Sequence, residues 1–112
     1  MQSLDEDTTL FIYGSLLDQR HRETILRRRL RCLTATVQGY RRERIRYYYL
    51  RQHPNAETEG QLLLNLTPDD FRVLDRYEEV PVLYTREKLS VTAASGEAIR
   101  CWAYMPTARM LG

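Results

Sequence analysis

Along six stretches of this 112-residue chain, apolar residues either alternate with polar ones or form short uninterrupted runs. Leu33, Ala35 and Val37, for example, alternate with polar neighbours, which is the pattern of a half-buried β-strand. The pattern predicts strands over residues 8–13, 33–39, 44–50, 60–66, 83–92 and 98–105. The segment Gln52–Thr58, which contains a His-Pro-Asn sequence, is predicted to be a loop.

Two other segments have the signals of helices. Asp18 can cap a helix that continues to about Leu30. Thr67 is a favourable N-cap for a second helix, which should stop near Glu79 because Pro81 disfavours helical geometry in the residue before it. Six strands with only two helices do not fit a doubly wound sheet. We therefore expect an α+β fold, a small mixed β-barrel of about six strands with two flanking helices.

The size and composition of the chain predict one domain over residues 1–112. The longest apolar runs are only a few residues, so no membrane-spanning segment is expected. Residues 1–7 are mostly polar and acidic, unlike a signal peptide, and we expect them to be flexible and the protein to be cytoplasmic. Cys32 and Cys101 lie far apart in apolar segments, which indicates buried free thiols and gives no metal-ligand spacing.

Glu78 occupies an unexpected position on the second predicted helix. With about 100° per residue and Leu74 at zero, Phe71 falls near +60° and Glu78 near +40°. The carboxyl of Glu78 therefore points with the apolar stripe, whereas Glu79, near +140°, faces water. Burial raises the pKa of a carboxyl, which suits a general base. A salt bridge between Glu78 and one of the many arginines is the alternative.

The net charge of +2 conceals an uneven distribution of charge. Residues 20–51 contain eleven arginines and two acids, whereas the rest of the chain is acidic. The arginines can pair with the acidic remainder across the fold or form an anion-binding face. Arginines and tyrosines are interleaved from Arg41 to Tyr49, as on some nucleic-acid-binding surfaces, but an exposed strand gives the same pattern. Nucleic acid is therefore not the favoured partner. His21 and His53 are expected to be ordinary surface histidines.

A second feature with possible chemistry is the segment Tyr13-Gly14-Ser15-Leu16-Leu17-Asp18, where a strand ends at a glycine and a helix follows. Successive amides at Gly14, Ser15 and Leu16 would form a receptor for a carboxylate or an oxyanion. Turns of this kind are also common without any function. With one glycine and no Lys-Ser/Thr ending, the segment is neither a dinucleotide-binding loop nor a triphosphate-binding loop.

The ordered set of short motifs resembles the γ-glutamylcyclotransferase-like superfamily, and most closely its avirulence-induced-gene-like branch. The opening motif is Phe11-Ile12-Tyr13-Gly14-Ser15-Leu16-Leu17. The others, in chain order, are Gly39-Tyr40-Arg41-Arg42, Glu59-Gly60-Gln61-Leu62-Leu63, Leu74-Asp75-Arg76-Tyr77-Glu78, Tyr84-Thr85-Arg86 and Ala103-Tyr104. The resemblance extends from about Leu10 to Met105.

This resemblance implies a small mixed β-barrel and a metal-independent enzyme without a cofactor. It implies that a γ-glutamyl amine or peptide is cyclised to 5-oxoproline, with Glu78 as general acid/base. It further implies that Tyr13, Gly14, Ser15 and Leu16 bind the substrate. By the same resemblance, two tyrosines line the pocket, Tyr84 and Tyr104.

The sequence departs from the superfamily at two places. Glu79 stands where many relatives have glycine, and the stretch from Tyr47 to Pro54 replaces a usual Tyr-Pro. The second departure is expected to reshape one wall of the pocket. Two other classes of function stay open: a non-catalytic module of the same fold that binds a small metabolite, and a nucleic-acid-binding protein that uses the arginine-rich half. The sequence gives no oligomeric state.

Overall fold

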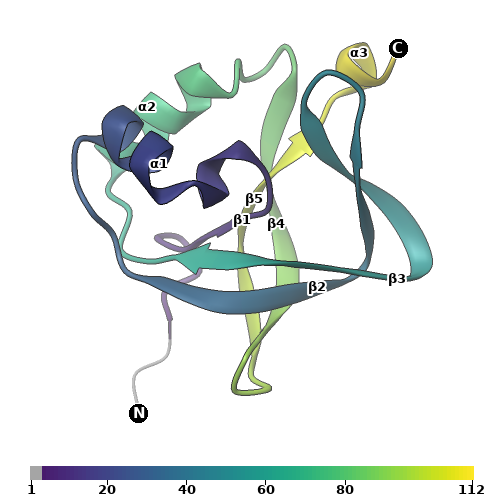
Figure 1. The fold of residues 1–112 in the computed structure, drawn as a ribbon, viewed down its shortest axis with the longest axis horizontal. Helices are drawn as coiled ribbons and strands as arrows, with labels where there is room; N and C mark the ends of the chain where they lie inside the picture. Colours follow the sequence, from purple (N-terminus) through teal and green to yellow (C-terminus); the bar gives the residue numbers. More distant parts are fainter. Residues whose placement is uncertain (1–3) are drawn as a thin grey trace.

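Five strands close into a barrel in the computed structural model, which describes residues 4–112 (Figure 1). Their order around the barrel is β1–β3–β2–β4–β5, and the closing pair, β1 with β5, is parallel. The strands are β1 (Leu10–Ile12), β2 (Cys32–Arg44), β3 (Tyr48–Leu63), β4 (Tyr84–Ala93) and β5 (Ala98–Pro106). The small mixed barrel is confirmed, with five strands in place of about six.

The count differs because β3 is one long strand where the sequence predicts two strands and a loop. β3 pairs with β2 from Arg44↔Tyr48 to Cys32↔Leu63, and this long-range pairing outweighs the local turn signals of His53 and Pro54. The prediction of a loop over residues 52–58 is therefore wrong. β2 likewise continues past Gly39, where the sequence predicts its end, and runs to Arg44.

The ladder between β2 and β3 accommodates the proline through a bulge. Pairing passes from Gln38↔Glu57 to Tyr40↔Gln52, so residues 53–56 lie opposite Gly39 alone. Gly39 has a φ of 83°, a left-handed conformation that glycine adopts at little cost. Beyond this bulge the two strands form a hairpin that rises beside the C-terminal end of the chain (Figure 1).

Strand β1 divides the apolar interior into two clusters because its side chains alternate. Leu10 and Ile12 belong to a cluster with residues of the helices, such as Leu26 and Leu74. Phe11 belongs to the other cluster, together with Tyr13, Val37, Leu62 and Ala103. The end of β1 is therefore fixed from both sides, which matters because the predicted substrate turn follows it.

The helices α1 (Gln19–Leu26) and α2 (Pro68–Tyr77) lie on one side of the barrel (Figure 1). Asp18 caps α1 as predicted, but the helix ends at Leu26 because Arg27 takes a left-handed φ of 59°. Two short elements were not predicted: the 3-10 turn η1 (Ser15–Leu17) and the helix α3 (Ala108–Leu111). Within residues 4–112, no helix has the length and apolarity needed to cross a membrane.

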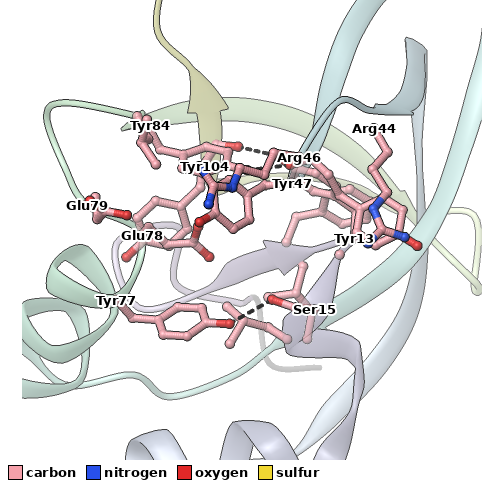
Figure 2. Close-up of a pocket in the computed structure, with 16 residues that line it drawn as sticks. Tyr13, Ser15, Arg44, Arg46, Tyr47, Tyr77, Glu78, Glu79, Tyr84 and Tyr104 are labelled. Atoms are coloured by element: carbon pink, nitrogen blue, oxygen red, sulfur yellow. Dashed lines mark hydrogen bonds between the residues drawn. The ribbon is translucent and has the colours of Figure 1, made fainter. Parts of the chain in front are cut away.

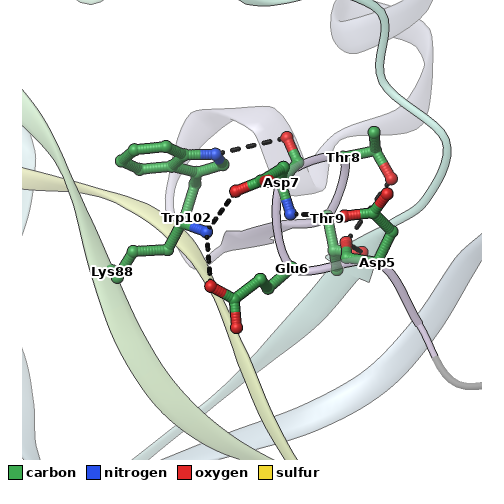
Figure 3. Close-up of polar contacts among 7 residues, drawn as sticks. All are labelled: Asp5, Glu6, Asp7, Thr8, Thr9, Lys88 and Trp102. Carbon is green, nitrogen blue, oxygen red and sulfur yellow. Dashed lines mark hydrogen bonds and ion pairs between the residues drawn. The ribbon is translucent and has the colours of Figure 1, made fainter.

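The described part of the N-terminal segment is attached to the barrel by polar contacts (Figure 3). Lys88 Nζ forms ion pairs with Glu6 (3.1 Å) and Asp7 (2.7 Å). The indole N–H of Trp102 donates to the Asp7 carbonyl at 3.2 Å. Residues 1–7 are predicted to be flexible; residues 1–3 of that segment lie outside the described residues.

Candidate active site

A pocket of about 320 Å³ lies between the end of β1, the end of α2 and the tip of the β2–β3 hairpin (Figure 2). Its volume is at the small end of the range of roughly 300–1,000 Å³ that is typical of small-molecule sites. The pocket is lined by all five residues that the sequence predicts for the site: Tyr13, Gly14, Ser15, Leu16 and Glu78. The structure therefore brings the glycine-containing turn and the predicted acid to one cavity.

The turn that follows β1 is held in place by side chains of other elements. The Tyr13 hydroxyl donates to the backbone carbonyl of Tyr104 on β5. Arg42 Nη1 donates to the Tyr13 carbonyl at 3.0 Å, and the buried Arg22 donates to the Leu16 carbonyl at 2.8 Å. Hydrogen bonds from α1 and β2 thus fix the backbone of this turn before any ligand arrives, and β5 anchors the Tyr13 side chain.

Gly14 allows the hairpin to approach this turn closely. A Cβ atom at Gly14 would lie 3.1 Å from the Tyr48 Cβ, tighter than ordinary contact. The next two residues, Ser15 and Leu16, begin η1, so their amides have no acceptor inside that turn. Among residues 4–112, no other backbone carbonyl accepts from these two amides. They are free to donate to a carboxylate or an oxyanion in the pocket.

Glu78 lies at the other wall, at the C-cap of α2. Its side chain is half-buried, whereas that of Glu79 is exposed, as the helical projection predicts. Burial raises the pKa of Glu78 from its usual 4.5 to about 7. Among the described residues, no arginine pairs with this carboxyl, so the salt bridge that the sequence left open is not formed. The carboxyl can therefore take up and release a proton near neutral pH.

Tyrosines form most of the wall beside Glu78, and their hydroxyls are already used. The Tyr84 hydroxyl donates to the Tyr48 carbonyl, and the Tyr104 hydroxyl donates to Asp75 at 2.7 Å. Burial raises the pKa of Tyr13, Tyr84 and Tyr104 well above the ordinary tyrosine value. These three tyrosines stay neutral and shape the pocket. Tyr84 and Tyr104 line the pocket as predicted.

A short hydrogen-bonded chain connects the end of α2 to the turn. Ser15 Oγ lies 3.0 Å from the Tyr77 hydroxyl oxygen, which is 2.7 Å from His21 Nε2 (Figure 2 shows the first of these contacts). His21 is exposed, as expected of a surface histidine, but it also contacts Tyr77. His53, predicted to be a surface residue, is half-buried, and its Nδ1 is shielded without a partner among the described residues.

The hairpin also lines the pocket, and it contributes two arginines that sequence reasoning did not assign to the site. Arg44, Arg46, Tyr47 and Tyr48 line the pocket from the hairpin tip, opposite α2. In Figure 2, Arg44 lies on the side of the pocket away from Glu78. For Arg44 and Arg46, the signal in the sequence was the run of interleaved arginines and tyrosines, which an exposed strand also explains. Two of the residues, Tyr47 and Tyr48, belong to the stretch predicted to reshape a pocket wall, and they do form one.

The arrangement combines a titrating carboxyl, two free amides and two arginines around a cavity for a small molecule. Such a site can hold an anionic guest and move a proton on it. Within the described part of the chain, no group of three or more His, Cys, Asp or Glu side chains is placed to hold a metal ion.

Comparison with known proteins gives a family match over most of the chain. The family model described as "Gamma-glutamyl cyclotransferase, AIG2-like" matches residues 10–110. A curated protein of Methanocaldococcus jannaschii, named "Gamma-glutamylcyclotransferase and putative RNase", is 27% identical over 112 residues. The match covers 94% of this chain and 50% of that protein, so the chain spans about half the length of this relative.

Solved structures share the fold at lower identity. A solution structure of an Arabidopsis thaliana protein has a TM-score of 0.82 and 24% identity, over 91% of this chain and 70% of that one. A structure titled "Gamma-glutamyl cyclotransferase" has a TM-score of 0.80 and 18% identity, over 89% and 66%. An AIG2-like protein of Mus musculus has a TM-score of 0.63 and 21% identity, over 91% and 78%.

Proposed function

Because the chain belongs to the gamma-glutamyl cyclotransferase, AIG2-like family, we propose that it cyclises a γ-glutamyl amine or peptide to 5-oxoproline and releases the amine. The observation that carries this proposal is that the Glu78 carboxyl and the Tyr13–Leu16 turn line the same pocket. Burial there raises the pKa of Glu78 to about 7. Membership of a family does not by itself fix a reaction, so the proposal depends on this geometry.

In the proposed reaction, the α-amine of the γ-glutamyl group attacks its own γ-carbonyl carbon. The α-ammonium first gives a proton to the Glu78 carboxylate, and the freed amine then forms the new C–N bond of a five-membered ring. The bond to the leaving nitrogen breaks as that nitrogen takes the proton from the Glu78 carboxyl. The second proton lost by the ring nitrogen ends on the released amine, which departs as an ammonium ion. One carboxyl with a raised pKa serves in both directions.

The other groups of the pocket act on charge and orientation. The tetrahedral intermediate carries an oxyanion, and the Ser15 and Leu16 amides are suitable donors to it. The loss of one such donor can cost about 3 kcal/mol of transition-state stabilisation. The neutral tyrosine wall holds the glutamyl chain in its folded rotamer, and orientation of this kind can supply several kcal/mol. Nucleophile and electrophile belong to one molecule, so the reaction needs no covalent intermediate with the protein.

The test is to incubate the protein with γ-glutamyl dipeptides and γ-glutamyl amines and to measure 5-oxoproline by chromatography. A reaction without protein corrects for spontaneous cyclisation. Glu78→Gln keeps the shape of the side chain and removes the base, so we expect a loss of at least ~100-fold in kcat/KM. Glu79→Gln is the matched control, because Glu79 is exposed, and it should keep nearly full activity. Full activity in the Glu78 variant would refute the assignment.

The same preparations distinguish the enzyme from the alternative, a non-catalytic module that binds a small metabolite. A binding module would be stabilised against thermal unfolding by glutamate or 5-oxoproline and would form no product. Product formation that depends on Glu78 excludes that reading.

A further inference from the structure

The arginines of the β2–β3 hairpin fall into two groups with different surroundings. Side chains alternate along a strand, so Arg41 and Glu43 of β2 share one face. Glu43 pairs there with both Arg41 and Arg51, and it accepts a hydrogen bond from the Tyr49 hydroxyl at 3.0 Å. The hydrogen bonds from Arg41 and Tyr49 lower the pKa of Glu43. On this face the Glu43 carboxylate is bound by three side chains of the hairpin itself.

The second group turns toward the pocket. The Arg42 and Arg44 guanidinium groups lie over the Tyr48 ring, 5.1 and 5.2 Å from its centre. Arg46 lies over the Tyr47 ring at 5.9 Å. Arg42 also donates to the Tyr13 carbonyl, whereas Arg44 and Arg46 line the pocket. Stacking on an aromatic ring orients a guanidinium group and leaves its edge N–H donors free.

Within residues 4–112, neither Arg44 nor Arg46 forms an ion pair with a carboxylate. Glu43, the acid next to Arg44 in the sequence, is held on the other face, and Glu78 has no arginine partner. The cationic tip is therefore available to an anion that enters the pocket. A planar guanidinium matches a carboxylate in shape as well as in charge.

The position of these arginines indicates which part of a substrate they reach. Tyr13, Tyr84 and Tyr104, beside Glu78, are buried, whereas Arg44 and Arg46 are exposed, and Figure 2 shows Arg44 on the side of the pocket away from Glu78. The reacting glutamyl head must have its amine at Glu78, and its α-carboxylate is bonded to the same carbon as that amine. The leaving group is bonded at the other end of the glutamyl chain, so it extends away from the α-amine and from Glu78.

We propose that Arg44 and Arg46 form an anion subsite that selects γ-glutamyl substrates whose leaving amine carries a carboxylate, namely γ-glutamyl amino acids and peptides. This inference rests on the proposed function and goes beyond it by naming the class of leaving group. A γ-glutamyl amine whose leaving group has no carboxylate would contact only the part of the site that binds the glutamyl group.

The experiment compares L-γ-glutamyl-L-alanine with L-γ-glutamyl-L-alaninamide, which has nearly the same shape and lacks the carboxylate. We expect kcat/KM to be about tenfold higher for the alanine compound, mostly through KM, because charge-assisted contacts at an exposed site have modest strength. In Arg44→Gln/Arg46→Gln the ratio should fall to about one, because KM rises for the alanine compound, which loses its charged contact. Added salt should lower the wild-type ratio as well, because these charges are exposed.

Arg51→Gln is the matched control, since Arg51 lies on the same hairpin and contacts Glu43 on the opposite face. It should keep the wild-type ratio. A wild-type ratio near one, or a tenfold ratio that survives in the double variant, would overturn the inference while 5-oxoproline formation upheld the proposed function.

A binding measurement separates the two proposals if no substrate is turned over. Calorimetry on the Glu78→Gln protein, which should bind without reacting, gives the Kd of both compounds. Tighter binding of the alanine compound that disappears in the triple variant supports the subsite even if the proposed reaction fails. Equal binding of the two compounds, or binding of neither, refutes the subsite.

Discussion

Asp75 and Glu78 are carboxylates three residues apart at the end of α2, yet their surroundings are opposite. Asp75 accepts two hydrogen bonds from Arg86, at 3.1 and 3.2 Å, and one from the Tyr104 hydroxyl at 2.7 Å. Glu78 faces the pocket without such partners among the described residues, and burial raises its pKa to about 7. Both acids are half-buried and they differ in their partners: Asp75 is bound by Arg86 and Tyr104, whereas Glu78 faces the pocket.

Arg86 explains why Asp75 is satisfied. Its guanidinium carbon lies 4.3 Å from the centre of the Phe71 ring and 4.6 Å from that of Trp102. The two rings hold the guanidinium group in place beside Asp75. Tyr104 belongs to both regions, because its hydroxyl is bound to Asp75 while its ring lines the pocket. The paired acid thereby supports the wall beside the unpaired one.

The sharpest test of this contrast is the dependence of activity on pH. If Glu78 must be ionised to act as the base, kcat/KM should fall tenfold per pH unit below about 7. At pH 5, about two units below, the rate should be ~100-fold below its plateau. Asp75→Asn should keep the same midpoint in the pH profile of kcat/KM, even if its activity is lower. A flat profile between pH 5 and pH 8 would contradict the role given to Glu78.

The next largest effect should be on stability, in Asp75→Asn. The change leaves the partly buried Arg86 without its counter-charge, and we expect a loss of about 2 kcal/mol, between the values for exposed and buried pairs. Thermal unfolding should shift down by roughly 10 °C. Asp69→Asn is the control, since the Asp69 side chain is 82% exposed and its pair with Arg72 should matter little. Equal losses of stability in Asp75→Asn and Asp69→Asn would show that the Asp75–Arg86 pair stabilises the fold no more than an exposed ion pair does.

Glu78→Gln should change stability in the opposite direction. The carboxyl titrates near 4.5 in the unfolded chain and near 7 in the folded protein, so the wild type loses stability as pH rises between these values. The variant lacks this loss. It should be more stable than the wild type by about 1–2 kcal/mol at pH 8 and equally stable at pH 4, with some discount for residual solvent. Denaturant unfolding at pH 4 and pH 8 measures the difference in the free energy of unfolding between the variant and the wild type. A variant less stable than the wild type at pH 8 would contradict the raised pKa of Glu78.

The smallest effect concerns Glu79, whose backbone has a left-handed φ of 54°. Glycine adopts this conformation at lower cost, which is a physical reason for the glycine that the motif pattern has at this position. Glu79→Gly should stabilise the protein by about 0.5 kcal/mol, since relief of strain is partly offset by the entropy of glycine. It should not move the pH midpoint, because burial and not Glu79 sets the pKa of Glu78. A clear shift of the midpoint would show that the two acids interact.

Helical geometry was enough to predict the direction of Glu78, because the phase of a helix is fixed by a few residues. The turn after β1 was likewise visible in the sequence, as a strand that meets a glycine. The places of Arg44 and Arg46 were not, because they depend on the register of a long hairpin that contains a bulge opposite Gly39. Non-local pairing of this kind leaves little local signal. The hydrogen bond between Asp75 and Tyr104 joins α2 to β5, so it could not be predicted from local sequence either.

The position of the hairpin tip outside the strand ladder determines how freely its residues can vary. Residues 45–47 lie beyond the last ladder pair, Arg44↔Tyr48, while the Arg42–Tyr13 and Tyr84–Tyr48 hydrogen bonds fasten the strands below them. Substitutions in that tip leave every barrel pairing intact, so its residues can vary at little risk to folding. A randomised library confined to these positions would test whether the tip sets substrate selectivity while the barrel stays folded.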